Sequence, residues 1–248
     1  MYGDIFIVFL FFAFPEYYND PLSGAGNSLL LLNRPSAVFH NPALIGDASE
    51  VSFNYARPFD LPELHQAQVS FQIEGFGFGA QTLRSGGYAE NRLIIGKSLS
   101  GRDLRAGIAL GAEDLTAGPD RIAALSLNLG FAFESFESKI ANSLHFTGVR
   151  IAGARDLFSP AMTLSFKYKG SGDINLYLDL FQEAGFPLGL RSGCSVKVGL
   201  MKVLFGISSV PDCYVLAFSL ATRPAFGYRL RVHPYLGATH CFGVAVRM

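Results

Sequence analysis

The sequence predicts an all-β fold, a closed antiparallel transmembrane β-barrel of about 14 strands with a short N-terminal plug segment. Three observations predict it. From about residue 50 onward, apolar and other residues alternate in short segments separated by turns rich in Gly, Pro, Asp, Asn and Ser. Charged residues make up only 16% of the chain. The positions between the bulky apolar residues carry mostly small side chains, not the long polar ones of a solvated surface.

The composition excludes several classes of protein. A charged share of 16% is low beside the roughly 25% of water-soluble domains, so we expect something other than water to cover much of the surface. The longest apolar run, residues 5–14, is too short for a spanning helix, which needs about 20 residues. The chain has 20 basic and 20 acidic residues, and this balance argues against nucleic acid as a partner.

The chain is predicted to divide into three parts. Residues 1–20, with the apolar run followed by polar residues, have the pattern of a signal peptide. Residues 21–49 are small, Pro-containing and without alternation, and we expect them to form a plug segment inside the barrel mouth. Residues 50–248 are expected to form the transmembrane barrel.

Alternation locates the strands and the connections. In 124–134, for example, Leu125, Leu127 and Leu129 share one face while Ser126 and Asn128 share the other. Connections after even-numbered segments are expected to be tight, and those after odd-numbered segments, such as 113–120, 151–159 and 182–187, to be longer. The predicted strands are 51–57, 65–73, 76–84, 90–98, 103–112, 121–133, 139–150, 160–169, 173–181, 188–198, 201–208, 213–221, 226–233 and 238–247.

The two faces of these strands leave two folds open. In a soluble secreted β-sandwich, the alternative interpretation and a binding module, the bulky apolar face turns into the core. In a membrane barrel that face meets lipid and the small and polar face lines a lumen. The second interpretation is favoured by the small residues and by aromatic residues near segment ends, including Tyr55, Tyr88, Phe181 and Phe226, which are typical of an interfacial girdle.

Both ends of the chain resemble a known family. Gly24-Ala25-Gly26, then Asn41-Pro42-Ala43-Leu44 before the first strand, and the hairpin 232–240 near the C-terminus are similar to FadL-like outer-membrane proteins of the PorV and PorQ type. The resemblance implies an integral protein of the bacterial outer membrane. Its role would be passage of hydrophobic or amphipathic compounds, or docking of exported proteins. The chain is short for the family and ends in Met248, where an aromatic residue is usual.

Two groups of residues are candidate sites. Pro42 fixes its own backbone and biases Asn41 toward extended geometry, so Asn41, Pro42 and Ala43 are predicted to form a hinge between plug and first strand. If the bulky faces meet lipid, several basic residues point inward and give a positive lumen. These residues are Arg105, Lys167, Arg191, Lys197, Arg229 and Arg231. They would either favour anions in an open lumen or pair with carboxylates of the plug.

No catalytic motif is present, and we expect no enzymatic activity, no cofactor and no metal. The five histidines are scattered, and Cys194, Cys213 and Cys241 are too widely spaced for a zinc site or a disulfide framework. The predicted barrel implies outer-membrane lipid as a partner, and the family resemblance implies hydrophobic small molecules or exported proteins. The sequence does not distinguish between these two kinds of cargo.

Overall fold

A computed structural model describes residues 34–101, 103–134, 140–153, 160–170, 173–210 and 212–248. The predicted signal peptide, residues 1–20, and the first part of the predicted plug, residues 21–33, lie outside the described residues. Among the described residues, no helix has both the length and the apolar character needed to cross a membrane.

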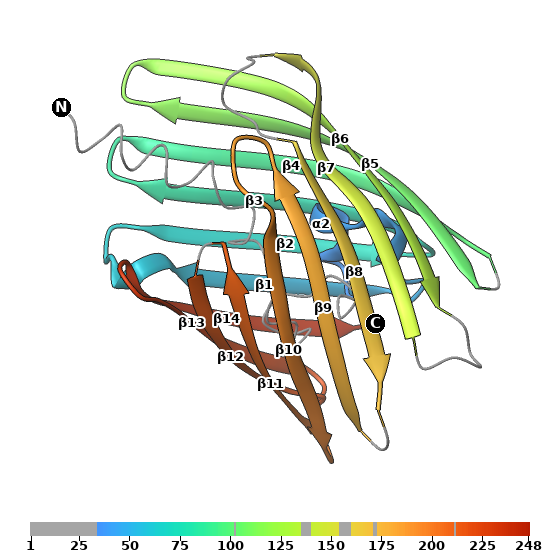
Figure 1. Ribbon diagram of the computed structural model, residues 1–248. Helices are drawn as coiled ribbons and strands as arrows, with labels where there is room; N and C mark the ends of the chain where they lie inside the picture. Colours follow the sequence, from blue (N-terminus) through green and yellow to red (C-terminus); the bar gives the residue numbers. More distant parts are fainter. Residues whose placement is uncertain (1–33, 102, 135–139, 154–159, 171–172, 211) are drawn as a thin grey trace.

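Fourteen antiparallel strands form one closed barrel (Figure 1), in which each strand pairs with its neighbours in the chain and β1 pairs with β14. Each strand of the wall therefore has two hydrogen-bonded neighbours, as a strand surrounded by lipid requires. The strands are β1 (Glu50–Arg57), β2 (His65–Ile73), β3 (Phe76–Ser85), β4 (Tyr88–Ser100), β5 (Leu104–Ala117), β6 (Asp120–Glu134), β7 (Ile140–Gly153), β8 (Ala161–Lys169), β9 (Ile174–Glu183), β10 (Gly189–Val198), β11 (Met201–Ser209), β12 (Asp212–Leu220), β13 (Ala225–His233) and β14 (Gly237–Arg247).

Every predicted strand segment falls on one observed strand, but the predicted loop 113–120 is wrong. Strands β5 and β6 continue through this region and leave only two residues between them, Gly118 and Pro119. The register runs unbroken from Leu104 opposite Phe133 to Ala117 opposite Asp120. Because backbone pairing continues after a strand leaves the lipid, while both faces then meet water, the alternation stops before the strand does.

The polarity of the wall is the reverse of that in a soluble protein. Leu93 is 62% exposed and Phe205 51%, whereas Ser52 and Asn128 are fully buried. Further exposed apolar residues are Phe53, Phe78, Leu110, Leu125, Leu176, Leu216 and Val246, and further buried polar residues are Asn54, Gln68, Gln72, Ser165, Asp179 and Arg229. A β-sandwich would bury the first set, so the soluble alternative is wrong. The wall suits lipid outside and polar groups inside.

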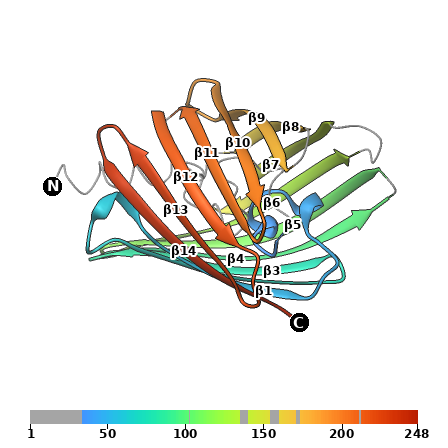
Figure 2. The ribbon, with the colours of Figure 1, turned by 90° about the horizontal axis from the view of Figure 1, so that it is seen from below.

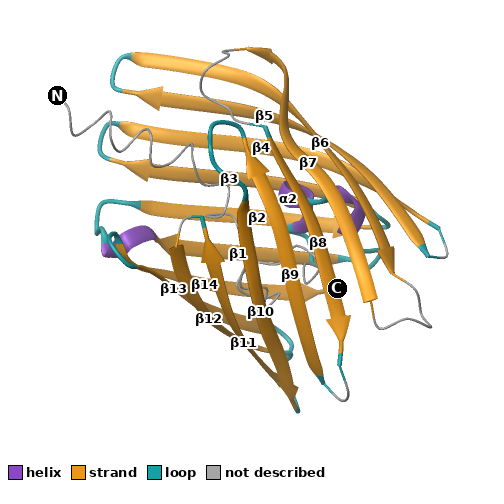
Figure 3. Ribbon diagram, viewed as in Figure 1, coloured by secondary structure: helices purple, strands orange, loops and turns teal. Residues whose placement is uncertain are grey.

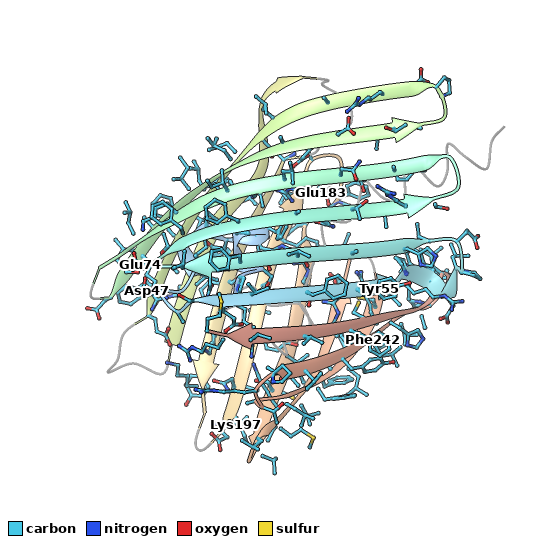
Figure 4. The ribbon with its side chains drawn as sticks, turned by 180° about the vertical axis from the view of Figure 1, so that it is seen from behind. Asp47, Tyr55, Glu74, Glu183, Lys197 and Phe242 are labelled. Atoms are coloured by element: carbon cyan, nitrogen blue, oxygen red, sulfur yellow. The ribbon has the colours of Figure 1, made fainter. Side chains whose placement is uncertain are left out.

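The two ends of the barrel differ. We call the end where β1 begins and β14 ends periplasmic, since an even number of strands returns both termini to that side. Asp47 and Glu74 lie together there, with the Glu74 backbone N–H donating to the Asp47 carbonyl at 3.1 Å (Figure 4). Tyr55 and its register partner Phe242 lie toward the opposite, extracellular end (Figure 4).

The apolar outer belt has a sharp extracellular edge on β4–β6. Below the edge the outward residues are apolar, as at Leu93 and Leu125, and the next outward positions are Asn91, Asp114 and Arg121. The guanidinium of Arg121 donates to the Asp114 carboxylate at 2.6 Å. This hydrogen bond, beyond the belt and in water, holds the pKa of Asp114 below its usual value. The edge therefore marks where lipid gives way to solvent.

The aromatic girdle is present in part. On the outer face, the Tyr55 hydroxyl is 2.6 Å from His65 Nδ1, and the Tyr228 hydroxyl is 2.7 Å from His240 Nδ1. Phe226 is exposed, as a girdle residue should be. The predicted places of Tyr88 and Phe181 are wrong, because both side chains are buried inside the wall. Their parity within the strand, rather than their place near its end, determines the face on which they lie.

The reversed polarity predicts a strong dependence on depth for outward substitutions on β5. Ile108→Arg, at the middle of the belt, is expected to lower the free energy of unfolding by about 2–4 kcal/mol. Thr116→Arg, on the same face but beyond the edge, is the matched control and is expected to cost at most about 1 kcal/mol. Urea unfolding in lipid vesicles measures both, and equal losses would contradict the assignment of the belt.

Candidate functional site

The interior holds the chain segment that precedes β1. Residues 34–49, here called the inner segment, include the short helix α2 (Ala37–His40) and the 3-10 turn η4 (Pro42–Leu44), which lie within the barrel in both views (Figures 2 and 3). Both elements are buried and contact β3–β6. At its start, Arg34 forms an ion pair with Glu50 of β1 at 2.7 Å.

The Asn41-Pro42-Ala43 triplet connects α2 to η4. Asn41 is extended, with φ −133° and ψ 99°, as a residue before proline should be. Its Oδ1 accepts the backbone N–H of Ala43 at 3.0 Å, and Pro42 occupies the first position of the turn. The triplet therefore caps η4 with a side chain and reverses the chain between α2 and the approach to β1.

Glycines on the inner face of β3–β6 make room for the inner segment. A side chain at Gly107 would overlap the backbone of Pro42 and Ala43, and one at Gly130 would overlap Asn41 Oδ1. We call this surface the glycine seat; its members are Gly77, Gly79, Gly96, Gly107 and Gly130. Small residues thus bring the inner segment into direct contact with the wall.

Hydrogen bonds fix the inner segment on this seat. Asn128 Nδ2 donates to the Phe39 carbonyl at 3.3 Å, and the Ser98 hydroxyl donates to the Ala43 carbonyl at 3.4 Å. The Gly46 backbone N–H donates to Gln72 Oε1 at 3.2 Å. Buried carbonyl and amide groups of an irregular segment need such partners, and here polar residues of three different strands supply them.

Apolar contacts continue from the inner segment across the interior. Phe39, Leu44 and Ile45 belong to one cluster of buried residues that also contains Leu204 and Val215 of the opposite wall. The other members on that wall are Tyr177, Cys213 and Ala217. The inner segment is therefore not only seated on β3–β6, because one continuous apolar cluster joins the two walls at this level.

A polar row crosses the inner face on the extracellular side of Phe39. Cross-strand register aligns Gln81 with Arg92 and Arg92 with Glu113. The Arg92 Nε atom is 3.1 Å from Glu113 Oε1, and Ser126 donates to the same carboxylate oxygen at 2.9 Å. The Arg92 guanidinium carbon also lies 5.9 Å from the Phe39 ring centre. Charged and amide groups thus lie on the inner face directly above the inner segment.

On the opposite wall, large side chains lie flat over glycine. Tyr177 covers Gly193 and Gly206, and its hydroxyl donates to the Phe205 carbonyl at 3.2 Å. The Phe181 ring covers Gly189, and the Arg191 guanidinium stacks on this ring at 3.7 Å from its centre. Such stacking holds an arginine in place while its charge remains inside the barrel.

The predicted basic residues occupy inward positions but do not form one group. Arg191, Arg229 and Arg231 are buried, and the last two donate to Cys241 and Cys213 at 3.4 and 3.3 Å. Arg105 and Lys167 are half-buried and Lys197 is exposed, all three near the periplasmic ends of their strands. Sequence reasoning missed Arg92 and Lys202, although alternation with Ile94 and Leu204, both buried, places each on the inner face.

The histidines whose side-chain contacts the structure describes lie in separate places. His65 and His240 each contact a tyrosine on the outer face, and His233 accepts backbone N–H groups of Tyr235 and Leu236 at 3.2 Å. In the part of the chain that the structure describes, no group of three His, Cys, Asp or Glu residues could hold a metal ion.

The glycine seat predicts that a single methyl group will disturb the inner segment. Gly130→Ala is expected to lower the free energy of unfolding by about 1–3 kcal/mol, because the new Cβ overlaps the Asn41 side chain. Gly87→Ala is the matched control, since a Cβ there meets nothing within 4 Å. Urea unfolding and limited proteolysis of residues 34–49 measure the effect. Two variants with equal stability and equal protease resistance would contradict the seat.

Comparison with known proteins supports the fold. Neither a protein-family model nor a curated protein matches the sequence. Among solved structures, the TodX deltaS2S3 mutant, described as a monoaromatic hydrocarbon channel, has a TM-score of 0.59 at 9% identity and covers 85% of this chain and 92% of its own. Omp33 of Acinetobacter baumannii has a TM-score of 0.53 at 8% identity and covers 81% and 98%.

These identities show the fold alone and give no support to the narrower FadL-like type, which stays a prediction. The closed sheet and the apolar outer belt independently indicate a transmembrane β-barrel, the fold that the comparison also shows. The chain is a β-barrel of the bacterial outer membrane.

Proposed function

We propose that this barrel is a non-enzymatic channel for small amphipathic compounds and that the inner segment is a plug that closes it at rest. The observation that carries the proposal is the position of this segment, seated on glycines of one wall and joined by apolar contacts to the other. Side chains alone can fill a barrel of about eight strands, whereas a barrel of fourteen strands encloses more space, which the inner segment occupies here.

The lining supports cargo that is amphipathic rather than purely hydrophobic. Amide and charged groups of Gln81, Arg92 and Glu113 lie on one side of Phe39, and the apolar cluster lies beside it. A compound with one polar end finds partners for both of its parts along this path. The TodX channel, which resembles this chain in fold and is described as a monoaromatic hydrocarbon channel, supports a channel role but not the amphipathic preference.

Docking of exported proteins, the other role suggested by the family resemblance, has less support. The extracellular connections between β3 and β4 and between β5 and β6 contain two residues each, Gly86-Gly87 and Gly118-Pro119. Connections this short leave little surface for a protein partner, whose interface typically buries about 800 Å² on each side.

Locking the plug tests the proposal. A Cβ at Gly77 would lie 3.0 Å from the Val38 Cβ, so a shift of the inner segment by roughly 1 Å gives the separation of about 3.8 Å found in a disulfide. The pair Val38→Cys and Gly77→Cys is introduced into a variant whose three native cysteines are alanine, and the protein is placed in a planar bilayer. We expect little current when the disulfide is formed and a several-fold increase when a reductant opens it.

The variant with Gly77→Cys alone is the control, because it cannot form the bond and should not respond to reductant. Equal currents in the oxidised and reduced double variant would show that the inner segment does not close the passage. Absence of current in both states and in the control would contradict a channel function altogether.

A further inference from the structure

Inward charges are distributed unevenly along the barrel axis. Among the residues whose side chains the structure describes, the extracellular half and the middle of the strands carry four inward acidic residues, Glu90, Glu113, Asp179 and Glu183, and four inward arginines, Arg92, Arg191, Arg229 and Arg231. Near the periplasmic strand ends, the inward acidic residues are Glu50 and Glu134. The inward basic residues at that level are Arg105, Lys167, Lys169, Lys197, Lys202 and Arg247.

Four of these six basic residues lie on β8, β10 and β11. Lys197 and Lys202 are direct cross-strand partners on the inner face, so two like charges stand opposite each other. Lys202 also interacts electrostatically with Lys167 and with Arg34 of the plug. Like charges directly opposite each other destabilise a sheet. An anion between the two ammonium groups would reduce their repulsion.

The two carboxylates at this level are already engaged by other cations. Glu50 forms its ion pair with Arg34, and Glu134 forms one with Lys169. Turns at the same end carry Asp47, Glu74, Asp103 and Asp173, all exposed outside the strand ladders. Charges in water are screened over about 10 Å at 0.1 M salt, so these carboxylates weaken the field inside the wall only in part.

We infer that this basic periplasmic mouth makes the channel selective for small anions. The inference rests on the proposed channel function and assigns its charge preference to the pair Lys197 and Lys202. Figure 4 shows Lys197 at the end of the β10–β11 wall, where a solute that has passed the plug leaves the barrel. Rings of basic side chains in a narrow pore favour anions because they replace part of the hydration of the ion.

The test is the zero-current potential across a planar bilayer under a KCl gradient, with K⁺ and Cl⁻ as the probes. It uses the full chain without the engineered disulfide between positions 38 and 77, so that the inner segment is free to move. We expect a Cl⁻ to K⁺ permeability ratio above unity that falls toward unity as salt rises. Lys197→Glu together with Lys202→Glu is expected to bring the ratio below unity, and the neutral pair Lys197→Gln with Lys202→Gln to give an intermediate value.

The matched control reverses two charges on the outer face, Arg84→Glu and Lys97→Glu, and should leave the ratio unchanged. Heat-dependent gel migration verifies that each variant is folded. A ratio at or below unity in the native chain, or one that the double reversal leaves unaltered, overturns the anion preference while the channel function stands. Absence of current overturns both.

Discussion

The barrel wall is a single layer of β-sheet that faces lipid on one side and a polar interior on the other. The rest of this structure depends on that constraint. Closure through the β1–β14 pair gives every strand two hydrogen-bonded neighbours. Once the backbone is paired in this way, the strand period of two divides the side chains. Large apolar residues face outward, and the interior receives Ser, Asn, Gln and Arg.

The same division explains how the interior holds an irregular segment. Several inward positions on β3–β6 are glycines, and these admit the backbone of the inner segment at close range. Polar inward residues such as Asn128 and Ser98 then supply hydrogen bonds to its carbonyl groups. On the opposite wall, Tyr177 and Phe181 fill the space above glycines, and Arg191 stacks on Phe181. The wall and the inner segment are thus complementary in size and in polarity.

Strand alternation predicted the strands because it follows from a local period of two residues, and the small residues between the bulky apolar ones, rather than the period, favoured the inverted faces. The extended geometry of Asn41 was also predictable, since the effect of Pro42 on the preceding residue is local. The site was not. Whether Gly107 and Gly130 bend the wall or seat a segment depends on what lies against them. The pairing of Lys197 with Lys202 requires cross-strand register. The end of the predicted strand at residue 112 failed because pairing outlasts alternation on β5.

The most direct test of the account is the side of the wall that meets lipid. The chain contains no Trp, so a single introduced Trp reports its own surroundings without background. Vesicles with brominated acyl chains are expected to quench the fluorescence of Phe131→Trp, on the outer face, and to leave that of Tyr177→Trp, on the inner face, nearly unchanged. Strong quenching of the second variant with none of the first would contradict the inverted wall.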